Sequence, residues 1–325
     1  MTSPRKALAL AVLTSVGLLS ACTATPAADN AAENRPIVDK SNWPEAVPER
    51  GLTKGLTLPL EFYMVSYADY VAIEEATTTL QQQCMADYGF QGIVFPQPGA
   101  NPPPSDNDAN IERRYGITDR TMAEKYGYGL PEELTRHTDQ KMPDLTGVQF
   151  EVLTGHTKPE MPKPPKGAKD GSYLGAPTTK PARAEHNGKK LHVGGCIGWS
   201  KKKVALHEED TVVVSNLSGE SLTASMTSAP VQAVIKDWAA CMKTKGHTLA
   251  NPYKAMDQGV SEADPQKSIT LALHDLACKE KTKLIQVWFD EESTIQKQAI
   301  KDHSTELKAV KSRHALTMTA ARSYG

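Results

Sequence analysis

The chain reads Leu80-Gln81-Gln82-Gln83-Cys84-Met85-Ala86-Asp87-Tyr88-Gly89-Phe90 at one place and Asp237-Trp238-Ala239-Ala240-Cys241-Met242-Lys243-Thr244-Lys245-Gly246-His247 at another. Both stretches contain Cys-Met-x-x-x-Gly. Apolar residues recur at steps of three and four before each cysteine, which predicts amphipathic helices near 67–88 and over 231–245. Each glycine stands where a left-handed residue would end the helix. We therefore expect both cysteines on the buried face of a last helical turn.

Residues at the expected starts of these helices support the prediction. Ser66 and Asp69 have the spacing of a capping box, in which the hydroxyl accepts a hydrogen bond from the first helical turn. Pro230 suits the first turn of the second helix, where a missing N–H costs nothing.

The N-terminus has the parts of a bacterial export signal. Arg5 and Lys6 are basic, residues 7–19 are uncharged, and Leu19-Ser20-Ala21-Cys22 resembles a lipobox. The uncharged segment is too short to cross about 30 Å of hydrocarbon as a helix. We expect cleavage before Cys22 and lipidation of that residue, which would hold the protein at the outer face of the cell membrane. The alternative is an ordinary signal peptide that is cut elsewhere.

Composition limits the classes of partner. Cleavage would remove two basic residues and no acidic ones, which lowers the formal net charge from −1 to about −3. This weak charge argues against nucleic acid as a partner. No later segment approaches the length of apolar sequence that a membrane helix needs, so the lipid is the only expected anchor. No cofactor motif occurs.

With Cys22 assigned to lipid, an even set of cysteines remains: Cys84, Cys196, Cys241 and Cys278. An oxidising compartment favours two disulfides, for which three pairings are possible. A zinc site is disfavoured because the chain contains no Cys-x-x-Cys pair. If each cysteine pair joins the end of one helix to the start of another, the bonds are Cys84–Cys196 and Cys241–Cys278.

This pairing suggests an organisation for the whole chain. We expect a signal peptide at 1–21, a lipidated flexible tether at 22–59 and an extracytoplasmic helical domain at 60–325. The domain could contain two modules, 60–210 and 211–325.

The expected fold is mainly α, with disulfide-stapled helices, long irregular loops, minor β and a long C-terminal helix. Proline and glycine are frequent over 91–190, which indicates loops. Thr211–Val214 is β-branched and predicts a short strand. Helices are expected over 200–206 and, as one long element, over about 266–321. Apolar residues are too sparse in this long element for a strong coiled coil. We therefore expect the element to pack on its own domain and not on a partner helix.

Four elements together resemble a group of uncharacterised secreted lipoproteins of actinobacteria. They are Cys84 to Gly89, Gly195 to Gly198, Trp238 to Met242 and Asp275 to Lys279, and the resemblance covers roughly residues 60–310. Members of the group carry an acidic residue after Gly-Cys-x-Gly, where this chain has Trp199. The resemblance implies an envelope location and a similar architecture, and it implies no chemistry.

Catalytic and metal-binding patterns are weak. Ser200 and Lys203 satisfy Ser-x-x-Lys, but Ser-Asp-Asn and Lys-Thr-Gly, which accompany it in penicillin-interactive enzymes, are missing. Asp106, Asp108 and Asn110 have the spacing of a calcium loop without its glycine or its glutamate. We assign no catalytic residue and no metal ligand, and we expect Asp275 to hydrogen-bond a neighbouring helix.

Tyrosines beside glycines are the one sequence feature that suggests ligand recognition. Tyr115, Tyr126, Tyr128 and Tyr173 could stack on sugars or an extended peptide, or could instead fix long loops to a small core. The leading hypothesis is a non-enzymatic binding or scaffolding protein at the outer face of the membrane, with an envelope protein or cell-wall ligand as partner. The alternative is a hydrolase that acts on cell-wall peptide or glycan.

Overall fold

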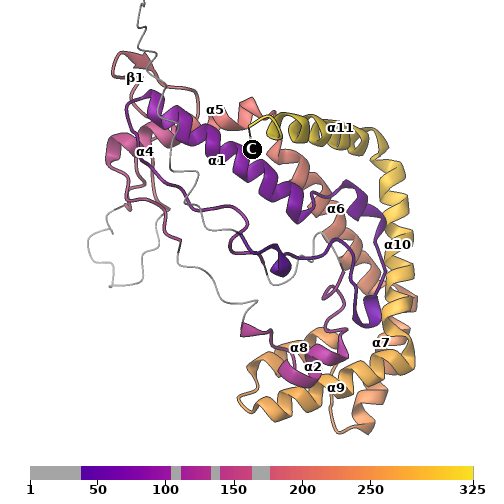
Figure 1. Ribbon diagram of the computed structural model, residues 1–325. Helices are drawn as coiled ribbons and strands as arrows, with labels where there is room; N and C mark the ends of the chain where they lie inside the picture. The colour runs from indigo at the N-terminus through magenta and orange to yellow at the C-terminus, as the bar shows by residue number, and fades with distance from the viewer. Residues whose placement is uncertain (1–37, 104–110, 133–139, 163–175, 325) are drawn as a thin grey trace, which may run out of the picture. The chain divides into compact units, whose positions relative to one another are not determined.

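Helices joined by loops make up most of the computed structural model, which describes residues 38–103, 111–132, 140–162 and 176–324 (Figure 1). In chain order the elements are η1 Lys40–Asn42, η2 Gly51–Thr53, η3 Pro59–Tyr63, α1 Tyr67–Asp87, α2 Arg120–Tyr126, α4 Gly147–Thr154, β1 Glu185–His186, β2 Lys189–Lys190, α5 Gly195–Lys203, α6 Glu208–Thr227, α7 Ala229–Thr244, α8 Pro252–Ser261, α9 Pro265–Thr282, α10 Leu284–Asp302 and α11 Ser304–Ala321. The mainly α fold with minor β is confirmed.

The two helices predicted from the repeated pattern are α1 and α7. The Ser66 hydroxyl caps α1 by accepting a hydrogen bond from the Asp69 N–H at 3.1 Å. The chain leaves the two helices through Gly89 and Gly246, whose φ angles are 92° and 87°. A side chain is strained at such angles, which is why glycine ends both helices.

Both predicted disulfides are present, Cys84–Cys196 and Cys241–Cys278. Cys196 lies in the first turn of α5, which begins at Gly195 and ends at Lys203, earlier than the expected 200–206. Cys278 lies near the end of α9 and not before the start of a helix. The second disulfide therefore joins the last turns of α7 and α9.

The predicted strand at Thr211–Val214 is wrong, since these residues belong to α6. Three acidic residues in the first turn of α6 favour a helix start through the helix dipole. Val214 packs with Leu60 and Leu307 in a buried cluster. Packing against η3 and α11 therefore overrides the strand preference of the β-branched side chains.

The two-stranded sheet is the antiparallel pair β1 and β2, in which Glu185 pairs with Lys190. Asn187 and Gly188 join the strands with φ angles of 49° and 73°. An Asn-Gly dipeptide with both φ angles positive is the favoured two-residue hairpin turn.

The helical C-terminal part is confirmed, but it is divided into α9, α10 and α11. Lys283 separates α9 from α10 with a left-handed φ of 57°, and His303 separates α10 from α11 with a φ of −104°. These breaks let each helix turn its own apolar face inward. Trp288 of α10 and Leu307 of α11 are fully buried in different clusters.

The predicted tether, residues 22–59, differs from the structure in its second half. Residues 38–59 contain η1 and η2, and Thr53 and Leu58 are buried. The Leu52 N–H donates to the Thr118 carbonyl at 3.0 Å, which ties this segment to the loop before α2. The folded part therefore begins before residue 60.

The two predicted modules are not separate bodies, because the described residues from Val38 onward belong to one compact unit. Ile73 of α1 packs with Met318 of α11 in a buried cluster, so the first and the last described α-helices share a core. Another cluster surrounds the first disulfide, and the largest surrounds the second together with Trp238 and Trp288.

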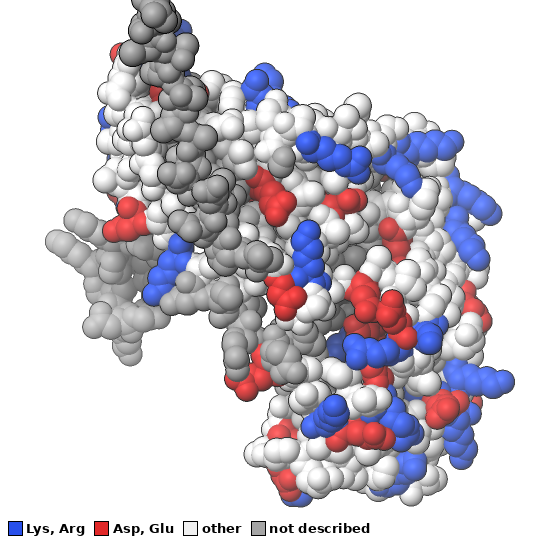
Figure 2. Space-filling view, viewed as in Figure 1, with Lys and Arg blue, Asp and Glu red and all other residues white. Residues whose placement is uncertain are grey.

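Neighbouring elements can be followed in Figure 1. α1 packs against α5 and α11, α10 packs against α6 and α7, and α9 is in contact with α2, α7 and α8. Basic side chains follow α10 and α11 in Figure 2, whereas both signs are mixed over much of the rest of that face. Among the described residues, no helix combines the length and apolar composition that a membrane crossing needs.

Candidate functional site

The described structure places the sequence-predicted residues as follows. Cys22, the predicted lipidation site, lies outside the described residues, as do the calcium-like loop Asp106 to Asn110 and Tyr173. Cys84, Cys196, Cys241 and Cys278 are paired in disulfides. These four thiols are therefore not available as nucleophiles or metal ligands.

Ser200 and Lys203 do not form a nucleophile–base pair. Ser200 is fully buried, and its hydroxyl donates to the Ile197 carbonyl at 2.9 Å and accepts from Gln81 Nε2 at 3.3 Å. The Lys203 ammonium lies 5.4 Å from the centre of the Trp199 ring. Ser200 thus joins α5 to α1.

Asp275 does bond a neighbouring helix. Its Oδ1 accepts from the Trp238 indole of α7 at 2.9 Å, and its Oδ2 accepts from the Tyr128 hydroxyl at 3.0 Å. The Lys279 ammonium lies 3.0 Å from the same Oδ2, and both side chains of this ion pair are fully buried. Burial lowers the pKa of Lys279, and the Asp275 carboxylate opposes that shift.

Two of the tyrosines beside glycines, Tyr115 and Tyr128, lie in the core, whereas Tyr126 is partly exposed. Tyr115 and Tyr128 are buried, at 0% and 1% exposure, and the Tyr115 ring stacks on Trp288 at 5.0 Å between centres. Their hydroxyls donate to Glu292 and Asp275. Of the two interpretations, the structure favours tyrosines that fix a loop to the core.

Among the histidines, His247 and His274 are in contact, with Nε2 and Nδ1 2.9 Å apart. Burial lowers the pKa of His274, and the nearby positive charge of Lys245 acts in the same direction. In the described part of the chain, no group of three His, Cys, Asp or Glu side chains is placed to hold a metal ion.

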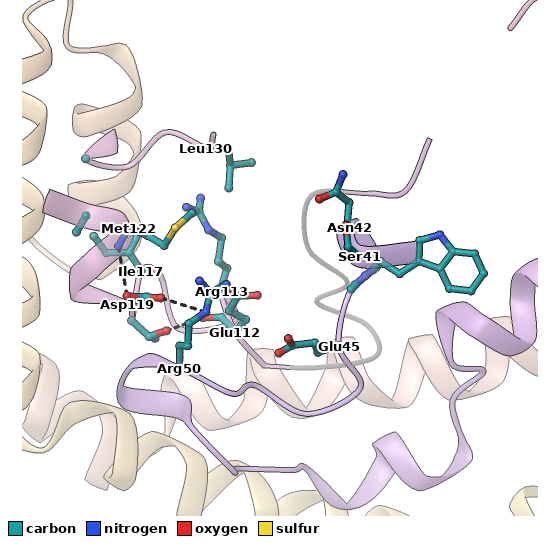
Figure 3. A pocket seen from close by; sticks show the side chains of 15 residues that line it. Ser41, Asn42, Glu45, Arg50, Glu112, Arg113, Ile117, Asp119, Met122 and Leu130 are labelled. Atoms are coloured by element: carbon teal, nitrogen blue, oxygen red, sulfur yellow. Dashed lines mark hydrogen bonds and ion pairs between the residues drawn. The ribbon is translucent and has the colours of Figure 1, made fainter. Parts of the chain in front are cut away.

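A cavity lies between the segment that carries η1 and the loop that leads into α2 (Figure 3). It has a volume of about 110 Å³. Its charged lining residues are Glu45, Arg50, Glu112, Arg113 and Asp119. We call this cavity the polar pocket.

The wall of the polar pocket is fixed by buried and partly buried hydrogen bonds. The Lys279 ammonium donates to the Ile117 carbonyl at 2.8 Å, and the Thr118 hydroxyl donates to the Glu112 carbonyl at 2.9 Å. The Tyr253 hydroxyl donates to the Arg114 carbonyl at 2.7 Å. An irregular loop without helical hydrogen bonds is thus held in one conformation by side chains from α8 and α9.

Asp119 lies at the base of the pocket, where it caps α2. Its Oδ1 accepts from the backbone N–H groups of Thr121 and Met122 at 2.8 and 3.3 Å. Its Oδ2 is buried and has no hydrogen-bond partner, and the nearest cation is Arg50 Nε at 3.7 Å. A buried carboxylate oxygen without a donor costs free energy, so Asp119 retains capacity for a donor.

Glu112, which also lines the pocket, has a shifted pKa. Burial raises the pKa of its carboxyl above the usual value, and the carboxylates of Asp119 and Glu45 add to the shift. The guanidinium groups of Arg113 and Arg50 oppose it. Burial is therefore the main cause of the raised pKa, and it outweighs the effect of the two arginines.

Sequence reasoning missed the polar pocket and the buried charges behind it. Arg113 and Arg114 look like surface residues of a loop, and nothing in their spacing points to Glu292 of α10, which bonds Arg114. The glycines of this loop were one sequence signal for its close packing. Gly116 and Gly127 have positive φ angles, and a Cβ at Gly127 would lie 2.5 Å from Ser268 Oγ, so the loop approaches α9 closely.

Comparison with known proteins finds no matching family model, no matching curated protein and no matching solved structure. The resemblance to actinobacterial lipoproteins therefore stays a prediction, and the functional argument depends on the residues themselves.

Proposed function

We propose that the chain is a lipid-anchored protein of the cell envelope, held at the outer face of the membrane through Cys22, which works by non-enzymatic binding or scaffolding. Cell-envelope location, membrane attachment and an envelope partner are parts of one proposal. The sequence Leu19-Ser20-Ala21-Cys22 behind an uncharged segment supports attachment.

The observation that carries the proposal is the use of cysteine. Every cysteine after Cys22 is paired, as Cys84–Cys196 and Cys241–Cys278. Structural disulfides persist in oxidising compartments and are rare in the cytosol. Two buried disulfides therefore support a place outside the cytoplasm, which agrees with an export signal at the N-terminus.

Binding is supported by the polar pocket. Its lining combines acidic and basic side chains with Trp43 and Met122, a mixture typical of recognition of a small polar group. Its volume of about 110 Å³ suits one functional group of a larger partner. Ser200, the candidate nucleophile, is instead bonded inside the core.

A hydrolase is the second candidate, because three carboxylates line the same pocket and the pKa of Glu112 is raised. A carboxyl with a raised pKa can serve as a general acid in glycoside hydrolysis. The lining residues include no histidine. The binding function is favoured because Asp119, the most buried of these carboxylates, is engaged as a helix cap.

Lipidation is tested by mass spectrometry of the N-terminal peptide from membranes of the native host. We expect a mature chain that begins at Cys22 and carries acyl groups. Cys22→Ser should release the protein from the membrane fraction, whereas Ser15→Ala in the uncharged segment should leave it attached. A mature N-terminus at any other residue, without acyl mass, would refute the anchor.

Binding is tested by crosslinking on intact cells, followed by identification of the captured molecules. The proposal expects a reproducible envelope protein or cell-wall partner whose capture falls when Asp119 is replaced by Asn. The hydrolase is tested by incubating the purified chain with cell-wall material. If the native protein releases soluble fragments and Glu112→Gln does not, the function is hydrolysis and not binding.

A further inference from the structure

We propose that one face of α11 docks on an anionic lipid surface. Its basic side chains are Lys308, Lys311 and Arg322, and the exposed apolar side chains Phe62 and Leu316 accompany them. We call these five residues the basic face. The inference rests on the proposed attachment to a membrane. It adds a second contact, between the folded part of the chain and the phosphate groups of phospholipids.

Positive charge is concentrated near the C-terminal end of the chain. Residues 297–324 contain six basic and two acidic residues, whereas the whole chain has a formal net charge of −1. Figure 2 shows the basic side chains along α10 and α11. Such an asymmetry gives the molecule one surface that attracts anions, although the chain as a whole is not basic.

The three cations of the basic face lie on one side of α11. Lys308 and Lys311 are about one turn apart, and Arg322 follows Lys311 by about three turns. The backbone of Arg322 at the end of α11 is still helical, so the same spacing applies to it. Residues near whole turns apart share a face of a helix. Leu307 and Val310 are buried and mark the side of α11 that faces the core.

The acidic side chains around α11 are in contact with other residues. Three of them each contact a histidine or an arginine: Glu306 contacts His303, Asp210 contacts Arg313, and Asp69 contacts His314. Glu306 is the one acidic residue within α11. Over residues 38–103, 111–132, 140–162 and 176–324, no ion pair includes Lys308, Lys311 or Arg322. Their charges are therefore available to a partner.

Exposed apolar side chains lie beside these charges. Phe62 of η3 is 65% exposed, and the Lys311 ammonium lies over its ring. Leu316 is 63% exposed and follows Lys308 by about two turns. Helices that bind at a membrane interface combine cations, which meet the headgroups, with Phe or Leu side chains, which enter the boundary of the acyl chains. The basic face has this combination.

A lipid surface suits the basic face better than a soluble acidic partner. Its cations are on the solvent side of a helix, where a surface of many phosphates can reach all of them together. The proposed anchor at Cys22 would also keep a membrane within reach and raise its effective concentration. A face that binds weakly by itself can therefore dock. A soluble partner would gain nothing from the anchor.

The number of cations sets the expected strength. Each Lys or Arg close to an anionic membrane strengthens binding by about fivefold, so three residues together give on the order of 100-fold. Salt weakens this attraction, because the Debye length shortens as the ionic strength rises. Binding should therefore require anionic lipid and should decline with salt.

The test is co-sedimentation of the purified chain of residues 22–325 with lipid vesicles. The chain carries Cys22→Ser, so that neither the leader nor an acyl group contributes to binding. One set of vesicles contains phosphatidylglycerol and phosphatidylcholine in equal parts, and the other contains phosphatidylcholine alone. We expect binding to the anionic vesicles at an ionic strength of about 0.05 M, loss of that binding at about 0.5 M, and little binding to the neutral vesicles.

Lys308→Gln/Lys311→Gln/Arg322→Gln should weaken binding to the anionic vesicles on the order of 100-fold. The matched control removes the same charge from exposed positions of other helices, and it is Lys236→Gln/Lys243→Gln/Lys281→Gln on α7 and α9. This control should bind almost as the native chain does. Circular dichroism checks that both variants fold.

Phe62→Ala/Leu316→Ala tests the apolar part of the basic face and keeps every charge. It should weaken binding to the anionic vesicles several-fold, and the weakened binding should still decline with salt. If this variant binds as tightly as the native chain, the apolar side chains do not enter the lipid and the proposed mode of docking is wrong.

Equal losses in the two charge variants would overturn the inference, because the effect would then belong to net charge and not to α11. Equal binding to the two sets of vesicles would also overturn it. So would binding to soluble polyglutamate as tight as to the anionic vesicles, since the partner would then be an acidic polymer. These results would leave the anchor at Cys22 intact, because that is judged by the N-terminal peptide. Absence of acyl groups at Cys22 would in turn leave the vesicle results unchanged.

Discussion

Arg114 and Glu292, which lie 178 residues apart in the chain, form a buried ion pair in which the Arg114 Nε donates to both carboxylate oxygens at 3.0 and 3.2 Å. Their side chains are 6% and 0% exposed. Tyr115, Ser221 and Gln296 also donate to Glu292. This carboxylate therefore joins the wall of the polar pocket to α6 and α10.

Removal of Arg114 should destabilise the fold, because it leaves Glu292 charged and buried without its cation. We expect Arg114→Met to lower the free energy of unfolding by about 3–5 kcal/mol. Urea denaturation followed by tryptophan fluorescence measures this. Asp257→Asn breaks the exposed pair with Lys254 and should leave the midpoint almost unchanged. Equal effects of the two variants would show that the buried pair is not important for stability.

Glu61 should make stability depend on pH. Burial, as the main cause, raises the pKa of its carboxyl to about 7 from the usual 4.5, and both carboxylate oxygens are buried without a hydrogen-bond partner. Arg114 lowers this pKa, and Glu292 raises it. The folded state therefore prefers the protonated form. The stabilising contribution is complete below about pH 4.5 and is lost as the pH rises through about 7.

The check is the urea midpoint of the native chain and of Glu61→Gln at pH 5 and pH 8. Glutamine stays neutral, so the variant should lose less stability than the native chain over this interval. Glu220→Gln, on an exposed position of α6, is the control and should retain the native pH dependence. If Glu61→Gln keeps the native pH dependence of the urea midpoint, groups other than Glu61 cause that dependence.

Gly195→Ala should hinder the Cys84–Cys196 disulfide. A Cβ at Gly195 would lie 2.5 Å from the Leu153 carbonyl oxygen and 2.6 Å from the Gly155 nitrogen, and the φ of Gly195 is 65°. The backbone at the start of α5 must then move away from α4, and Cys196 moves with it. Quantitative thiol labelling of the purified protein should show more free cysteine.

Gly219→Ala is the matched control, since a Cβ there would have open space inside α6. Alanine favours helix over glycine, so this variant should be as stable as the native chain or slightly more stable. If both variants form both disulfides fully, the close approach at Gly195 is not required for pairing.

The two disulfides should contribute unequally. They close loops with sequence separations of 112 and 37 residues. Chain-entropy estimates give about 4.8 kcal/mol for the longer loop and about 3.8 kcal/mol for the shorter. Cys84→Ser/Cys196→Ser should therefore lower the Tm more than Cys241→Ser/Cys278→Ser. Non-reducing peptide mapping checks the pairing, and a Cys84–Cys241 peptide would contradict it.

Local sequence signals predicted the parts of the fold that depend on neighbours in the chain. The apolar spacing before Cys84 and Cys241 placed α1 and α7, because helix periodicity and a glycine stop act within a few residues. A different local signal, the β-branched run, failed at Thr211–Val214, where three acidic residues and burial against Leu60 and Leu307 favour a helix. The Asn187-Gly188 turn shows that a local signal for the hairpin was present and was not used.

The sequence by itself determined the mainly α class, the two helices with cysteine at their ends and the expectation of a lipid anchor at Cys22. It suggested one disulfide pairing among three, which the structure confirms. Only the tertiary structure decided where the polar pocket lies, that the pKa of Glu112 is raised and which charges are buried. The reason is physical. Burial raises the pKa of Glu112 although Arg113 and Arg50 lower it, and burial is a property of the packed chain that local spacing does not encode.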